Sequence, residues 1–163
     1  MLFRSYNDGR KEEDYFFNSF INQDPHLFKL SIIGKGWHKY VKAFKEKKIE
    51  VDFQRFFFRK LYLNKMRNLD YLIYLGNDEG SMSFLDAIQL GMKTIMIPQG
   101  FQSDLQELIT YKVDKTLKNF PDIISKIISE KRKFLETKKK LNWENYAFQH
   151  CEIWKNLKIK TKT

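Results

Sequence analysis

The regular alternation of short apolar runs with helical stretches is the feature that most constrains the fold of this chain. Apolar runs of strand length lie at residues 1–3, 26–34, 49–57, 70–76 and 93–98. Helical patterns lie at residues 12–23, 37–48, 61–69, 81–91 and 103–109, and again from about residue 121 onward. Strands separated by helices form βαβ units, in which right-handed crossovers make the strands parallel. The sequence therefore predicts an α/β fold, with a Rossmann-like parallel sheet flanked by helices and a helical C-terminal tail.

The length and apolar content fit one packed domain. The chain has 163 residues, of which 42% are hydrophobic and 16% aromatic, and this is enough to build a core. No low-complexity linker interrupts it. We expect a Rossmann-like core over residues 1–120 and a helical extension over residues 121–163 that packs on the same domain.

The scarcity of cysteine and histidine limits the chemistry. Cys151 is the single cysteine, and the three histidines (His26, His38 and His150) are far apart in sequence. We therefore expect no disulfide and no metal site, and Cys151 is predicted to be a small buried apolar group. The N-terminus has no apolar run of the signal-peptide type, and no stretch reaches the ~18 apolar residues of a membrane span. A cytoplasmic protein is expected, with peripheral attachment to the inner face of the membrane as an alternative.

Positive charge is concentrated in the tail. The net charge is +10, and residues 131–163 contribute +7 of it because they carry 10 Lys and Arg against 3 Asp and Glu. Such a segment suits a solvated helix face, an anionic membrane surface or a phosphate backbone. Because no nucleic-acid-binding motif accompanies it, we expect no nucleic-acid partner, and an anionic membrane surface remains an open partner.

Loops that follow the strands of an open parallel sheet are where ligands bind. Three of these loops carry polar or glycine-rich sequence, and we expect them on one edge of the sheet. The loop after the first strand carries Arg4, Arg10 and Lys11, and the loop after the second carries Gly34 and Gly36. The loop after the fourth strand reads GNDEGS, at residues 76–81.

The turn formed by Gly80, Ser81 and Met82 has the form of an anion site. It lies where a strand leads into a helix, and the N–H groups of a first helical turn suit a phosphate. Asp78, Glu79 and Asp86 would repel that phosphate unless they accept sugar hydroxyls. A nucleotide sugar satisfies both requirements. The alternative is that Asp78 caps the helix, Glu79 is a favourable first-turn charge and Asp86 is merely solvated.

The segment DEGSMSFLDAIQLGMKTIMIPQG resembles the donor-binding motif of the GT-B-fold group 1 bacterial glycosyltransferases. In that motif two acids enclose seven residues, as Asp78 and Asp86 do, and a helix, a glycine and a strand follow. IIGKGW is similar to the family's glycine-rich loop, and WENYAFQHCEIWKNL is similar to its closing helices. Two departures are that the family acids are usually Glu, and that Glu79 lies where the family usually has glycine.

The resemblance implies a division of roles among the candidate residues. Asp78 and Glu79 would be the catalytic, sugar-holding acids, and Asp86 would bind the ribose. The diphosphate would be held by Arg4, Lys11 and the turn of Gly80, Ser81 and Met82, with Arg10 as a competing basic residue and Gly34 and Gly36 lining the site. Phe56, Phe57 and Phe58 are expected in the core or an interface, with a surface for stacking a nucleobase as the alternative.

The same resemblance implies one half of a GT-B enzyme. That fold has an acceptor half and a donor half, and this chain matches the donor half, so a missing N-terminal acceptor-binding domain is an expected partner. The implied activity is retaining, hexosyltransferase-like transfer from a nucleotide-diphosphate sugar without a bound metal, in surface polysaccharide or glycolipid synthesis. The isolated half is expected to be inactive. The alternative function is a non-catalytic α/β module that binds a nucleotide or an anionic surface.

Overall fold

The structure is a computed structural model that describes residues 11–76 and 80–160, with side chains described as far as residue 157. The chain divides into two compact units, unit 1 (Met1–Lys126) and unit 2 (Ile127–Thr163). The strand expected at residues 1–3 lies outside the described residues.

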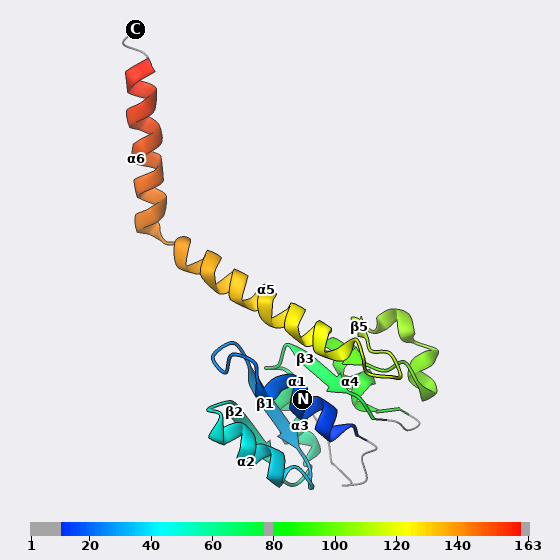
Figure 1. The fold of residues 1–163 in the computed structure, drawn as a ribbon. Helices are drawn as coiled ribbons and strands as arrows, with labels where there is room; N and C mark the ends of the chain where they lie inside the picture. Colours follow the sequence, from blue (N-terminus) through cyan, green and yellow to red (C-terminus); the bar gives the residue numbers. More distant parts are fainter. Residues whose placement is uncertain (1–10, 77–79, 161–163) are drawn as a thin grey trace. The chain divides into compact units, whose positions relative to one another are not determined.

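Unit 1 alternates helices and strands along the chain (Figure 1). Its elements are α1 (Glu13–Ile21), β1 (Lys29–Ile33), α2 (His38–Glu46), β2 (Glu50–Gln54), α3 (Arg59–Met66), β3 (Tyr71–Tyr74), α4 (Ser83–Gln89), β4 (Lys93–Met96), the 3₁₀ helices η1 (Gly100–Ser103) and η2 (Gln106–Leu108), and β5 (Tyr111–Lys112). The predicted α/β class is confirmed.

All strand pairings among the described residues are parallel. β1 pairs with β2, with Ile33 opposite Gln54, and β4 lies between β3 and β5. The described strands thus form a two-stranded and a three-stranded sheet, where the sequence predicts one. A single buried cluster nevertheless includes Ile33 of β1, Tyr62 of α3, Tyr74 of β3 and Phe84 of α4, so elements next to both sheets share one core.

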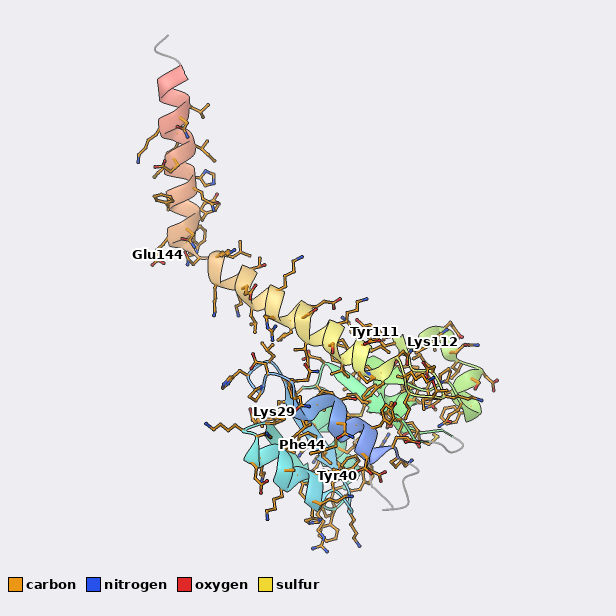
Figure 2. All side chains as sticks on the ribbon, in the orientation of Figure 1. Lys29, Tyr40, Phe44, Tyr111, Lys112 and Glu144 are labelled. Atoms are coloured by element: carbon orange, nitrogen blue, oxygen red, sulfur yellow. The ribbon has the colours of Figure 1, made fainter. Side chains whose placement is uncertain are left out.

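Burial follows from the apolar pattern of each element. The strands β3 and β4 are short apolar runs that are buried almost throughout, as expected of parallel strands covered by helices. On α2 the buried residues Tyr40, Val41 and Phe44 recur at helical spacing, whereas its lysines are exposed. Tyr40 and Phe44, labelled in Figure 2, pack on Phe17 of α1 with ring centroids 5.4 and 5.0 Å apart.

In the region after β4 one prediction is wrong and one strand was not predicted. The sequence predicts one helix over residues 103–109, but η1 ends at Ser103 and only the short 3₁₀ helix η2 (Gln106–Leu108) lies within this range. Strand β5 was not expected, because two residues give no readable period. Its neighbour Thr110 exchanges hydrogen bonds with Thr94 of β4 at 3.1 Å in both directions, and these tie the segment to the sheet edge.

Unit 2 contains the rest of α5 (Phe120–Lys140), which begins in unit 1, and α6 (Trp143–Lys160). Figure 2, where Glu144 marks the first turn of α6, shows side chains projecting around that helix. The rings of Trp143, Tyr146, His150 and Trp154 follow one another along α6 at centroid distances of 5.6, 4.3 and 6.2 Å. Cys151 is exposed, so its predicted burial is wrong. Among the described helices none is long and apolar enough to cross a membrane.

Candidate functional site

The loop after β1 meets the loop after β2. Gly34 donates its N–H to the carbonyl of Gln54 at 2.8 Å, which continues the β1–β2 pairing past the end of β1. Gly34 and Gly36 adopt φ values of 116° and 92°, which residues with a Cβ rarely adopt. Lys35 between them places its Nζ 5.7 Å from the centroid of the Phe56 ring. The glycine loop therefore adjoins the segment that leads into α3.

Three consecutive phenylalanines after β2 are exposed. Phe56, Phe57 and Phe58 are 53%, 52% and 58% exposed. The Phe57 ring still reaches Tyr62, with centroids 5.2 Å apart. The prediction that these residues are buried in the core is therefore wrong. That they form an interface or a surface for stacking a nucleobase remains a prediction.

Asp86 is held by two residues of α3. The Arg59 guanidinium donates to both carboxylate oxygens of Asp86, from Nη1 at 2.5 Å and from Nη2 at 2.7 Å. The hydroxyl of Tyr62 donates to Oδ2 at 2.9 Å. The side chain of Asp86 is only 12% exposed, so the alternative that it is a solvated surface charge is wrong. This contact joins α3, the helix after β2, to α4, the helix after β3.

The pairing shifts the pKa of each partner. The pKa of Asp86 lies below its usual value, chiefly because Arg59 donates to the charged carboxylate, with Tyr62 adding to the effect. Burial of the Tyr62 ring raises the pKa of its hydroxyl, and the neighbouring negative charge of Asp86 raises it further. Asp86 is therefore a carboxylate and Tyr62 a neutral hydroxyl at neutral pH.

Hydroxyl groups connect this pair to the turn before α4. Tyr62 also hydrogen-bonds with Ser83, and the Ser83 hydroxyl lies 2.5 Å from that of Ser81. Ser83 is buried, whereas Met82 is 69% exposed. Because α4 begins at Ser83, Asp86 lies in the first turn of this helix. Ser81 and Asp86 thus belong to one hydrogen-bonded network.

Gly80 joins the same turn to the loop after β4. Its φ is 108°, and a Cβ at this position would lie 2.9 Å from Cε1 of Phe101 and 3.5 Å from the amide carbon of Gln102. Only glycine fits both the backbone conformation and the contact. The turn after β3 therefore packs directly on the segment after β4.

Lys11 reaches the end of β3. Its Nζ hydrogen-bonds with the hydroxyl of Tyr74 and lies 4.3 Å from the centroid of that ring. A Cβ on Gly76 would lie 2.9 Å from the same Nζ. One predicted basic ligand thus lies beside the start of the loop that contains the predicted acids.

The described candidates therefore lie at the carboxyl ends of the strands. Lys11 adjoins the end of β3, Gly80, Ser81 and Met82 form the turn before α4, and Asp86 is bound to α3. Gly34 and Gly36 lie in the loop after β1, where Gly34 donates its N–H to the last residue of β2. Four candidates lie outside the described residues, so their roles remain predictions: Arg4, Arg10, Asp78 and Glu79.

Sequence reasoning did not identify Arg59, Tyr62, Tyr74 or Gln102 as parts of this region. Arg59 and Tyr62 were missed because their partner Asp86 is 27 and 24 residues away, a distance at which sequence spacing gives no signal. Tyr74 lies within the apolar run at residues 70–76, so its position predicts a core residue. A readable signal was the basic character of the segment RFFFRK at residues 55–60, directly after a strand.

The arrangement suits an anionic ligand rich in hydroxyl groups. Lys11 and Arg59 are cations that cannot accept hydrogen bonds, whereas Asp86 accepts and the serine hydroxyls do both. Among residues 11–76 and 80–160, no group of three His, Cys, Asp or Glu side chains is placed to hold a metal ion. Comparison with known protein families finds no family model that matches the chain, and comparison with curated proteins finds no match.

Proposed function

We propose that this chain is the donor-binding half of a retaining glycosyltransferase, which takes a sugar from a nucleotide-diphosphate sugar. The main support is the convergence of Lys11, the Gly80 turn and Asp86 at the carboxyl ends of parallel strands. Lys11 and Asp86 are 75 positions apart in sequence, and Asp78 and Asp86 have the spacing of the two acids in the family motif described above.

The proposed roles follow from the charges. Lys11 neutralises part of the negative charge of the diphosphate. The turn of Gly80, Ser81 and Met82 lets the diphosphate approach the backbone closely. Asp86 accepts a ribose hydroxyl. Asp78 and Glu79 hold the sugar in this proposal, and Arg4 and Arg10 complete the basic side of the site.

The Arg59 contact refines the role of Asp86. An ionised carboxylate has about four positions for hydrogen-bond donors, and Arg59 and Tyr62 occupy three of them. One position is left for a hydroxyl, so a single ribose hydroxyl is the expected partner in place of two. Arg59 is 58% exposed, so its remaining N–H groups can donate hydrogen bonds to the diphosphate.

Calorimetric titration in EDTA tests the proposal. The probes are UDP, GDP and ADP and their glucose or mannose conjugates. We expect the wild type to bind the nucleotides that carry one of these three bases. Lys11→Met should weaken that binding about tenfold, because a charge-assisted contact is lost. Lys45→Met, at an exposed position of α2, is the matched control. Absence of binding to every probe would overturn the proposal.

A further inference from the structure

Unpartnered polar atoms gather in one short segment after β4. Among the described residues, four buried side-chain atoms have no hydrogen-bond partner: Ser31 Oγ, Gln99 Nε2, and Nε2 and Oε1 of Gln102. Three of these four belong to two glutamines that are three residues apart. Gln102 is fully buried, with 0% of its surface exposed.

Such burial is unfavourable in the free protein. An amide removed from water without a replacement hydrogen bond costs free energy, and native proteins leave few such groups. The backbone of the same segment is satisfied in the ordinary way, since Gln102 N–H donates to the Gln99 carbonyl at 3.1 Å. The deficiency is therefore confined to the two side chains.

The carboxamide of Gln102 lies against the proposed donor site. Its amide carbon is 3.5 Å from where a Gly80 Cβ would be, so the amide packs against the bare glycine backbone of the turn before α4. Glycine lets this turn shift without the steric penalty of a side chain. Because Gln102 is fully buried, a ligand seated at the turn would contact its amide only when the Gly80 backbone moves aside.

We propose that Gln102, with Gln99 beside it, forms a subsite for hydroxyl groups of the sugar of a nucleotide-sugar donor. This inference rests on the proposed function and names a specificity residue of that site. A carboxamide both donates and accepts, and both of its polar atoms lack partners here. A hydroxyl also does both, whereas a phosphate oxygen accepts only and would satisfy half of the amide. The sugar therefore fits the Gln102 side chain better than the diphosphate does.

The test compares Gln102→Met with wild type in stability and in binding. Methionine has a similar length and no strong hydrogen-bonding atom, so it removes the amide and keeps most of the volume. We expect the melting temperature to stay equal or to rise by about 2–4 °C, because the unpartnered amide is gone. Affinity for the bound nucleotide sugar should fall about tenfold, and affinity for the matching nucleoside diphosphate should change less than about threefold.

Gln99→Met should also lower the affinity for the nucleotide sugar, but by less, since only one polar atom of the Gln99 side chain is unpartnered. Gln106→Met, at an exposed position of η2, is the matched control and should change neither property. Unchanged affinity for the nucleotide sugar in Gln102→Met would overturn the inference while leaving the proposed function intact. Two other results for Gln102→Met would overturn the inference as well: equal losses of affinity for the nucleotide sugar and the diphosphate, or failure to fold. Either result would mean that the amide stabilises the loop and does not bind the sugar. A wild type that binds no probe would instead mark the failure of the proposed function.

Discussion

Asp86 shows at the level of a residue what spacing can and cannot reveal. Its distance from Asp78 and its place in a helix were readable from the sequence, and the structure has it in α4. Its ion pair with Arg59 was not readable, because that contact depends on how two βαβ units pack side by side. The pair also explains why a carboxylate that is only 12% exposed stays ionised.

Replacement of this carboxylate should affect binding and stability together. Asp86→Asn leaves Arg59 without a charged partner, so we expect a loss of about 1 kcal/mol in the free energy of unfolding, an amount limited by the exposure of Arg59. Affinity for the nucleoside diphosphate and for the nucleotide sugar should fall alike, by about tenfold, because both ligands carry the ribose. Calorimetry and urea unfolding measure the two effects. Asp70→Asn, at an exposed position before β3, is the control, and a loss restricted to the sugar-bearing ligand would remove Asp86 from the ribose.

The lowered pKa of Asp86 predicts a pH dependence of stability with a definite sign. In the folded chain the carboxylate is favoured by Arg59, so the unfolded chain takes up the proton first as the pH falls. The stabilisation is present above about pH 4 and is lost as the pH falls through the lower pKa of the folded state. Urea unfolding of wild type and Asp86→Asn between about pH 3 and pH 7 should give curves that converge at the acid end. Curves that stay a constant distance apart would contradict this assignment.

At the level of elements, the turn between β3 and α4 is specified by glycine geometry. Gly80→Ala should be clearly destabilising, by about 1–3 kcal/mol, because φ of 108° is unfavourable for alanine and the new Cβ would overlap Phe101. It should also weaken nucleotide binding. Gly91→Ala, just after α4, is the matched control: it also has positive φ, at 66°, but its Cβ would meet no atom within 4 Å. Equal effects of the two substitutions in urea unfolding would show that the contact with Phe101 contributes nothing.

The elements show why part of this fold was predictable. The four strands β1 to β4 and the helices α1 to α4 were predicted from apolar runs and helical periods, because the burial of most of these elements follows directly from those patterns. The separate η1 and η2 and the two-residue β5 were missed, because tertiary packing on the sheet edge determines them. Gln102 was missed for the same reason, since nothing in the sequence shows that a glutamine after a strand is fully buried.

At the level of the whole molecule, the two units differ in composition and exposure. Unit 1 holds the core and every described residue of the candidate site. Unit 2 is basic, and the ring side chains along α6 include Trp143 and Trp154 at 82% and 61% exposure. In the proposed two-half enzyme these rings and Tyr146 are candidates for contact with the acceptor half.

We therefore expect the 163-residue chain to bind donor without transferring sugar. Holding two substrates in one cleft can contribute ~7–11 kcal/mol to lowering the barrier, and that contribution requires the acceptor half. The measurement is the rate of sugar transfer from a radiolabelled nucleotide sugar to lipid extract, with and without a candidate acceptor half added in trans. Substantial turnover by the chain alone would contradict the two-half account.

The central claim is that a nucleotide sugar binds at the carboxyl ends of the strands in unit 1. The most direct test is a titration of the ¹⁵N-labelled chain with the best calorimetric ligand, followed by backbone amide shifts. We predict that the largest shifts belong to Lys11, Gly34, Gly80, Asp86 and Gln102, with little change at Lys29 and Lys93, where β1 and β4 begin. Shifts concentrated at the beginnings of the strands or along α6 would contradict the claim.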